Sequence, residues 1–256
     1  MQTVTLQEKL YGKSSLKLLE AHLRSLCEGL QVDVNVLELT DRGWIRANIS
    51  GEDETAASSL FQDRFGFAPI ELKKVEMGTV QRGKVLPLRK NSTEVAVDIG
   101  VLIPKPVDAI ISLQHLQAEL VDGKKLSLHD VARLFCLTNN FPVSVLIKRL
   151  DNEGNRFVAE LSEKQISLFA EWICTNLERL VIIGAFIDGV EQAVQRSGHL
   201  RDVAEIETLG LLEHAIVCKL GTYAAGLIPR IGRLLPNAAL EVFSPRAVQA
   251  SAENTR

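Results

Sequence analysis

The stretch that most constrains the fold of this chain runs from residue 78 to residue 116, GTVQRGKVLPLRKNSTEVAVDIGVLIPKPVDAIISLQHL. It is rich in Val and Ile, which favour extended strands, and Gly, Pro and polar turns interrupt it at short intervals. Such punctuation is typical of short antiparallel strands and not of long helices. We therefore interpret residues 78–116 as the front half of a small β-barrel.

The residues that follow complete this barrel. Ser127 is a plausible N-cap for a short helix, with Asp130 three residues later. Two further strands, 141–150 and 155–162, form a hairpin over the turn DNEG. Five strands with a helix between the third and the fourth is the order of an oligonucleotide-binding barrel. We assign this barrel to residues 71–162.

The regions before and after the barrel mix helices and strands. Residues 1–70 give the order βαββα, which predicts a small α/β sandwich that ends near Phe67–Ile70. Residues 163–246 give the order αβααβαβ, with two successive helices divided at Ser197-Gly198-His199, and predict a C-terminal α/β domain. Residues 247–256 have no apolar period, and we expect a flexible tail. The fold class is therefore α+β and multidomain.

Composition narrows the class of protein. A net charge of -3 and a pI near 6.0 exclude a protein that coats nucleic acid through bulk charge. No run approaches the roughly 18 apolar residues that span a membrane, and the start lacks the pattern of a signal peptide, so we expect a cytoplasmic protein. The four cysteines show no metal-binding spacing. We therefore expect buried free thiols, no metal site and no cofactor.

Basic residues concentrate in the barrel stretch. Between Gly78 and Pro106 five basic residues face two acidic ones, Glu94 and Asp98, a local balance of +3. These basic residues are candidate contacts for RNA phosphates. The alternative is a solvated charged face on a barrel that serves as a spacer or a protein-docking module. Asp98 is interpreted as an acceptor for turn amides. The candidate phosphate contacts are Arg82, Lys84, Arg89, Lys90 and Lys105.

The C-terminal domain holds a second set of polar residues. Arg196, His199 and Arg201 surround the break between the two predicted helices and are candidates for a second RNA-contacting patch. His199 and Asp202 could instead form an acid–base pair, with Glu207 as a third member, if the three side chains converge on one cleft. The junction at residues 218–222 is a strand–Gly–helix turn, whose free amides could hold a phosphate.

The barrel stretch resembles the S1-type RNA-binding domain. Gly78-Thr79-Val80 matches the opening of that domain, and Ala109-Ile110-Ile111-Ser112-Leu113-Gln114-His115-Leu116 keeps the apolar spacing of its third strand. The resemblance covers about ninety residues and implies RNA binding on the barrel. The stacking aromatics of the domain are absent, and Val95, Val97 and Ser112 occupy that neighbourhood. Binding would then depend on charge and shape.

Across nearly its full length the chain resembles an archaeal protein family defined by a domain of unknown function. The matching stretches are Lys9-Leu10-Tyr11-Gly12, Ser50-Gly51-Glu52-Asp53-Glu54, Val97-Asp98-Ile99-Gly100, Ser197-Gly198-His199 with Arg201-Asp202, and Cys218-Lys219-Leu220-Gly221-Thr222 through Gly226-Leu227-Ile228-Pro229. The resemblance implies an archaeal, cytoplasmic origin, but it brings no established activity and no residue roles.

The sequence therefore leads to one main hypothesis and two alternatives. The main hypothesis is an RNA-associated binding protein, linked to the ribosome, translation or RNA processing, whose partner is RNA or a ribonucleoprotein. The first alternative is a nuclease or an RNA-modifying enzyme with its site in the C-terminal domain. The second is a protein-interaction scaffold that binds a protein partner or forms a homodimer.

Overall fold

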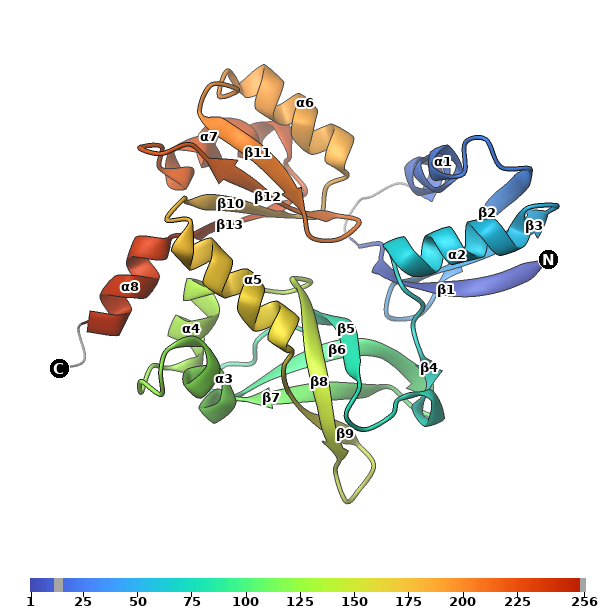
Figure 1. Ribbon diagram of the computed structural model, residues 1–256, viewed down its shortest axis with the longest axis horizontal. Helices are drawn as coiled ribbons and strands as arrows, with labels where there is room; N and C mark the ends of the chain where they lie inside the picture. Colours follow the sequence, from blue (N-terminus) through green and yellow to red (C-terminus); the bar gives the residue numbers. More distant parts are fainter. Residues whose placement is uncertain (12–15, 254–256) are drawn as a thin grey trace. The chain divides into compact units, whose positions relative to one another are not determined.

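The computed structural model describes residues 1–11 and 16–253. The chain forms two compact units, residues 1–70 and residues 71–256 (Figure 1). As the sequence predicts, the fold is mixed α+β and multidomain, with a β-barrel in the central region.

The first unit is a three-stranded antiparallel sheet with two helices. The strands lie in the order β1-β3-β2. Alternating residues such as Val4, Val34 and Ile49 are buried, as the period of two predicts for strands covered on one face. The predicted order βαββα is confirmed. Its elements are β1 (Gln2–Lys9), α1 (Leu16–Leu26), β2 (Val32–Leu39), β3 (Trp44–Gly51) and α2 (Glu54–Arg64).

A fourth extended segment lies beside β1. The amide of Gln7 donates to the carbonyl of Gly66 at 2.9 Å, and the amide of Ala68 donates to the carbonyl of Thr5 at the same distance. The segment leads into the two-residue strand β4 (Ile70–Glu71) and the short 3₁₀ helix η1 (Leu72–Lys74). With this segment the first unit has the order β-α-β-β-α-β.

The second unit begins with the predicted five-stranded barrel. Each strand pairs with the next in the order β6-β5-β8-β9-β7, and β7 pairs again with β6, which closes the ring. Small and β-branched side chains such as Val97, Ala109 and Val145 fill the interior. The strands are β5 (Val80–Val85), β6 (Glu94–Ile103), β7 (Val107–Ser112), β8 (Pro142–Leu150) and β9 (Arg156–Leu161).

Two helices, not one, separate the third and fourth strands. The sequence pattern predicts a third strand that runs to Leu116, but β7 ends at Ser112 and α3 (Leu113–Leu120) begins. The Ser112 hydroxyl accepts a hydrogen bond from the amide of His115, which makes Ser112 the N-cap of α3. The predicted cap at Ser127 is confirmed, since it accepts from the amide of Asp130 at the start of α4 (Leu128–Leu134).

The C-terminal part of the second unit is a four-stranded antiparallel sheet in the order β11-β12-β10-β13. This order and the succession β-α-β-β-α-β are those of the ferredoxin-like arrangement. Helices α6 and α7 cover one face of the sheet, and α5 lies on the other side (Figure 1). The elements are α5 (Glu163–Cys174), β10 (Arg179–Ile183), α6 (Ile187–Ser197), β11 (Val203–Thr208), β12 (Glu213–Cys218), α7 (Ala224–Leu234) and β13 (Ala239–Phe243).

This topology corrects the predicted order αβααβαβ. Residues 201–213, predicted as a helix, form strand β11 and the turn into β12. The amides of Leu209 and Gly210 both donate to the carbonyl of Glu213 and close this hairpin. Val203 and Ile206 face the core beneath α6 and α7. Pairing with the fully buried strand β12 therefore outweighs the helix-favouring composition of the segment.

The predicted flexible tail is also wrong for most of its length. Helix α8 (Pro245–Glu253) begins with proline, which suits the first helical position because its missing N–H would be unsatisfied there. The Ser244 carbonyl accepts from the amides of Ala247 and Val248, and the Val248 side chain is buried. Residues 254–256 lie outside the described residues.

The barrel and the C-terminal sheet share a core of aromatic side chains. Phe169 of α5 lies at the centre of this cluster, with its ring 5.1 Å from that of Phe135 and 6.2 Å from that of Phe141. Trp172 continues the contact to Phe243 of β13, with ring centroids 5.0 Å apart. All five side chains are buried. The two regions therefore pack against each other as interiors do.

A buried ion pair crosses the same junction. The Lys84 ammonium of β5 lies 2.6 Å from the Glu213 carboxylate of β12, and both side chains are at most 2% exposed. Arg179 of β10 lies over the Trp172 ring, 5.0 Å from its centroid, and contacts the Glu207 carboxylate at 3.0 Å. The face of the sheet that points away from α6 and α7 is thus covered.

The described residues include neither a membrane-spanning helix nor a metal-binding cluster. None of their helices is long and apolar enough to cross a membrane. They contain no group of three or more His, Cys, Asp or Glu placed to hold a metal ion.

All four cysteines are free, and Cys174 is exposed, contrary to the prediction that all are buried. Burial raises the pKa of the Cys218 thiol to about 11.

Candidate nucleic-acid interface

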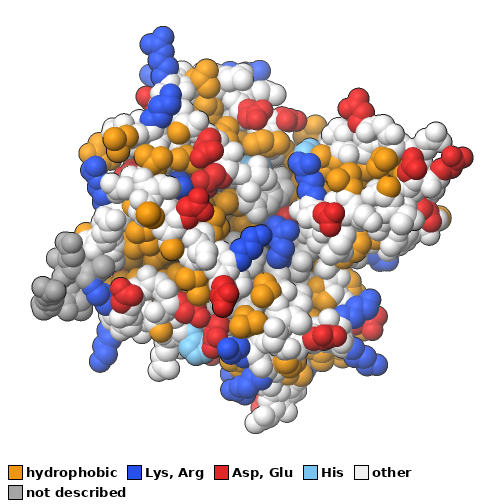
Figure 2. All heavy atoms as spheres, viewed as in Figure 1, with side chains coloured by type: hydrophobic (Ala, Val, Ile, Leu, Met, Phe, Trp, Pro, Cys, Tyr) orange, Lys and Arg blue, Asp and Glu red, His pale blue; other side chains and the backbone are white. Residues whose placement is uncertain are grey.

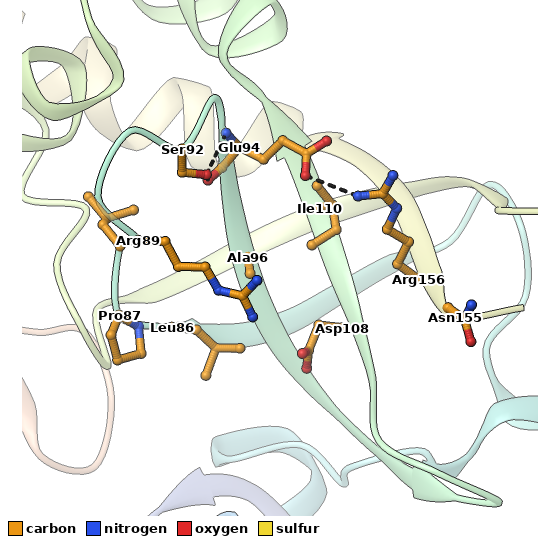
Figure 3. Close-up of a pocket in the computed structure, with 11 residues that line it drawn as sticks. Leu86, Pro87, Arg89, Ser92, Glu94, Ala96, Asp108, Ile110, Asn155 and Arg156 are labelled. Atoms are coloured by element: carbon orange, nitrogen blue, oxygen red, sulfur yellow. Dashed lines mark hydrogen bonds and ion pairs between the residues drawn. The ribbon is translucent and has the colours of Figure 1, made fainter.

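A groove lies on the outer face of the barrel, over its second and third strands. It has a volume of about 560 Å³. The loop between β5 and β6 forms one wall, and the end of the loop between β8 and β9 forms the other (Figure 3). The face of strands two and three, flanked by these two loops, is where oligonucleotide-binding barrels hold their ligands.

Strand register decides which side chains reach this groove. Glu94 and Ala96 of β6 point outward, and Ala96 pairs with Ile110 of β7. Asp108 pairs with Arg156 across the parallel contact of β7 and β9. The intervening residues of β6 and β7 point into the barrel and are buried, as alternation along a strand requires.

Arg156 of β9 links β6 and the turn after β8 at one wall of the groove. Its guanidinium lies 3.1 Å from the Glu94 carboxylate and 3.6 Å from that of Asp151 (Figure 3). Partial burial would raise the pKa of Asp151, but amide hydrogen bonds from Asn155 and Arg156 and the Arg156 charge lower it overall. Asp151 therefore stays ionised and orients Arg156, whose side chain remains half exposed.

Arg89 extends from the opposite loop across β6 (Figure 3). The amide of Leu86 donates to the carbonyl of Ala96 at 2.8 Å, which ties the base of this loop to the strand. At its tip, the amide of Ser92 donates to the carbonyl of Arg89. Asn91 takes a positive φ of 61°, a conformation that asparagine tolerates in turns. The loop thus presents Arg89 from a defined turn.

Lys105 contacts the far end of the groove. It lies in the corner between β6 and β7, and its ammonium donates to the side-chain oxygen of Asn155. Asn155 lines the groove, and its amide donates to the Asp151 carboxylate at 2.7 Å. Lys90 is exposed beside Arg89 on the loop tip. The predicted residues Arg89, Lys90 and Lys105 therefore lie in or beside the groove.

The other two predicted barrel contacts lie elsewhere. Arg82 and Lys84 belong to β5, which pairs with β6 and β8 and does not line the groove. Lys84 is buried and paired with Glu213, so its ammonium cannot reach a phosphate. The prediction that Lys84 contacts RNA is therefore wrong. Arg82 is half-buried and belongs to the same side of the barrel.

Asp98 behaves as the sequence suggested. Its carboxylate is fully buried and accepts a hydrogen bond from the amide of Gly100 at 3.0 Å. The residues proposed to replace the stacking aromatics need a correction, since Val95 and Val97 point into the barrel. The outward residues of β6 and β7 that line the groove are Glu94, Ala96, Asp108 and Ile110, and none of these is aromatic.

The polar residues of the C-terminal domain split into two groups. His199 Nδ1 lies 2.7 Å from the Asp202 carboxylate, so these two side chains form a pair. Glu207 is instead held by Arg179. Asp202 precedes β11 and Glu207 lies five positions further along the chain, a span of up to roughly 16 Å when the chain is extended. The hypothesis of a single catalytic cleft that uses all three residues is therefore wrong. Arg196 and Arg201 are exposed beside His199.

The strand–Gly–helix turn at residues 218–222 does not offer a free helix start. The amide of Ala224, the first residue of α7, already donates to the Glu178 carboxylate at 2.8 Å. Glu178 also accepts from the Ser244 hydroxyl at 3.1 Å. A carboxylate at this position occupies the site that a phosphate would need.

Sequence reasoning missed Arg156 and Asn155. Both follow the DNEG turn, which the sequence does identify as the link between strands four and five. In an oligonucleotide-binding barrel this loop lies beside the loop between strands one and two. The signal was therefore present in the strand order, although not in the local charge. On the face shown in Figure 2, Lys and Arg side chains are interspersed with Asp and Glu.

Three family models match successive parts of the chain between residues 3 and 243. The DUF2110 N-terminal domain matches residues 3–70, the central domain matches residues 75–173, and the C-terminal domain matches residues 177–243. The chain belongs to the DUF2110 family. Its central domain contains the barrel and α5, and its C-terminal domain is the four-stranded sheet with α6 and α7. No curated protein matches this sequence.

Solved structures show low similarity to this DUF2110 protein. A protein of vaccinia virus (Wisconsin strain) is 16% identical, with 34% of this chain and 89% of that chain covered and a TM-score of 0.22. A chain in the a/eIF2alpha–aDim2p–rRNA complex of Pyrococcus horikoshii is 13% identical, with 50% of this chain and 70% of that chain covered and a TM-score of 0.26. The intact alpha subunit of aIF2 from Pyrococcus abyssi is 12% identical, with 66% of this chain and 96% of that chain covered and a TM-score of 0.24. At TM-scores this low the similarities do not bear on function.

Proposed function

We propose that this protein binds single-stranded RNA in the groove over β6 and β7. The observation that carries the proposal is the position of the groove, on the face of the second and third barrel strands and between the two loops that flank it. A volume of about 560 Å³ lies within the range of sites that enclose small ligands and nucleotides.

The groove has basic side chains for the phosphates of the RNA and acidic side chains for its bases. Arg89, Arg156 and Lys105 lie along it and are the contacts for phosphates. Glu94 and Asp108 lie between them and accept hydrogen bonds, as base amino groups require. The two acidic residues also limit the positive charge, so binding depends on base contacts as well as on phosphates.

The groove favours single strands over duplexes. Single-stranded RNA presents unpaired base edges to a groove of this kind, whereas the bases of an A-form duplex are turned inward. Because no aromatic residue lines the groove among the described residues, stacking does not hold the bases there. The expected affinity is modest and falls with salt, with a slope of about -0.7 in log–log units per phosphate contact.

The test is a titration of fluorescently labelled single-stranded RNA at several salt concentrations, followed by fluorescence anisotropy. Arg156→Ala removes a groove contact, and we expect weaker binding together with a shallower salt slope. Arg133→Ala is the matched control, because Arg133 is an exposed arginine of α4 outside the groove. Equal loss with both substitutions would show that binding does not use the groove.

Absence of binding by the wild-type protein at low salt would remove the proposal. The barrel would then act as the scaffold that was the second alternative. If RNA does bind, crosslinking followed by sequencing identifies whether ribosomal or other RNA is the natural partner. This last step decides between roles in translation and in RNA processing.

A further inference from the structure

Aromatic side chains are almost all internal in this protein. The chain has nine Phe, two Trp and two Tyr, and all of them fall within the described residues. Tyr223 alone is exposed, at 65%, while the others are buried or half-buried. Stacking of a base on an aromatic ring at the surface therefore has one candidate residue.

Tyr223 belongs to a pair of adjacent loops at one end of the C-terminal sheet. One loop, residues 219–223, joins β12 to α7, and the other, residues 198–202, joins α6 to β11. The amide of Lys219 donates to the carbonyl of Asp202 at 2.8 Å, which holds the loops together. Leu200 and Leu220 are exposed at their tips, at 62% and 80%. The loop pair thus presents apolar surface to solvent.

Basic side chains surround this apolar surface. Lys219 and Arg201 are exposed on the two loops. Arg230 of α7 is exposed too, and its guanidinium donates to the carbonyl of Ser197, just before the second loop. Two carboxylates lie nearby, Asp202 beside His199 and Glu178 at the Ala224 amide, and the three basic side chains outnumber them. The local charge therefore suits a polyanion.

A small hollow lies beside Tyr223. Its volume is about 40 Å³, and Lys219, Thr222 and Arg246 are among the residues that line it. Such a hollow is too small to enclose a nucleobase. The hollow, which Glu178 also lines, therefore does not hold a base, and the exposed ring of Tyr223 beside it is the surface available to one.

We propose that Tyr223 stacks an unpaired base of the RNA, and that Lys219 and Arg201 contact the adjacent phosphates. This inference rests on the proposed function and adds a second contact that the barrel groove does not supply. A charged rim around a flat exposed ring favours a single-stranded nucleic acid over a protein partner, because stacking accepts any base and the charge matches its backbone.

The experiment compares four variants in the same anisotropy titration with single-stranded oligouridine. Tyr223→Ala should weaken binding by about five-fold or more and leave the salt slope unchanged, because the ring carries no charge. Tyr223→Phe should bind like the wild type, because it keeps the ring. Lys219→Ala should reduce the salt slope by about 0.7, the loss of one phosphate contact on a single strand. Leu220→Ala is the control for loss of apolar surface on the same loop.

The outcomes separate this inference from the proposed function. It is overturned if Tyr223→Ala binds as tightly as the wild type, or if Tyr223→Phe is as weak as Tyr223→Ala. If Arg156→Ala weakens binding while Tyr223→Ala does not, the groove proposal stands and the stacking proposal fails. If the wild type binds no RNA, both fail. An equal loss with Leu220→Ala would indicate apolar contact in place of stacking, and would also overturn it.

Discussion

The barrel has two sides that are built from different residues. The side towards the C-terminal sheet carries buried Lys84 and the rings of Phe135 and Phe141. The side over β6 and β7 carries Ala96, Ile110 and a mixture of charges around an open groove. The strands are continuous between the two sides, so the backbone is not the difference. The difference is where the aromatic residues lie.

This contrast explains why a barrel of this type lacks an aromatic platform. Aromatic residues make up only 5% of the chain, and one cluster at the junction with the C-terminal sheet uses five of them. These rings stabilise the packing of two regions against each other. The groove, by comparison, is lined by small or aliphatic side chains and by charged groups, and by no aromatic ring among the described residues. One side of the barrel is therefore packed against the C-terminal sheet, and the other carries an open groove.

The largest expected effect is on the aromatic side. Phe169→Ala should lower the free energy of unfolding by about 4 kcal/mol, because it leaves a cavity among neighbouring rings. Urea denaturation measures this loss. Ile110→Ala, a substitution of a half-buried residue in the groove, is the comparison and should cost far less. Similar losses for both would mean that the two sides contribute equally to stability.

The next effect concerns the buried ion pair. Glu213→Ala should lower the free energy of unfolding by about 3 kcal/mol, because it removes the carboxylate beside a buried ammonium group. Glu160→Ala is the matched control, since Glu160 pairs with Lys148 at 2.8 Å on the surface. This substitution should lower the free energy of unfolding by roughly 0.5 kcal/mol. Thermal or urea unfolding of the two variants gives the comparison. Equal costs would show that burial adds nothing to the pair.

On the groove side a change should affect binding and not stability. Arg156→Ala breaks two ion pairs, but the Arg156 side chain is 52% exposed, so the free energy of unfolding should fall by roughly 1 kcal/mol or less. RNA affinity should fall in the same variant. Denaturation and anisotropy on one preparation measure both. A large loss of stability would mean that the groove is part of the structural core.

The smallest effect involves pH. Burial raises the pKa of Glu241, which lines a groove with Arg133 and Ser251. Since the folded state binds this proton more tightly than the unfolded state, ionisation costs stability as pH rises through the raised pKa. Glu241→Gln should therefore stabilise the protein at pH 7 by about 0.5 kcal/mol, and the gain should vanish near pH 4. Unfolding measured at both pH values checks the sign, and a gain that persists at low pH would contradict it.

Most of the fold follows from local patterns. Alternating strands in residues 32–39 and 94–103 are visible in the sequence, and so is the cap at Ser127. The failure at residues 201–213 has a tertiary cause, because an acidic segment becomes an edge strand only when the buried strand β12 is there to pair with it. Helix α8 was missed for a related reason, since the packing of Val248 compensates for its weak apolar pattern.

The candidate site was harder to predict than the fold. Arg89 could be found from local charge, but Arg156 required knowledge of which loops meet. Lys84 looked equivalent to Arg89 in the sequence, although its partner Glu213 lies 129 residues further along the chain. No local signal distinguishes a lysine that faces solvent from one that meets a distant carboxylate. Long-range pairing, and not residue type, separates the two.

The distance along the chain between Lys84 and Glu213 has a consequence for synthesis. Residues 71–162 leave the ribosome before the strand that carries Glu213 exists, so the nascent barrel lacks that carboxylate and exposes Phe135 and Phe141. Nascent chains that display such apolar surface are targets for chaperones and for aggregation. Helix α5 brings Phe169 onto these two rings, and β12 and β13 then add Glu213 and Phe243. The order of the chain therefore delays completion of this junction until β12 and β13 have been synthesised.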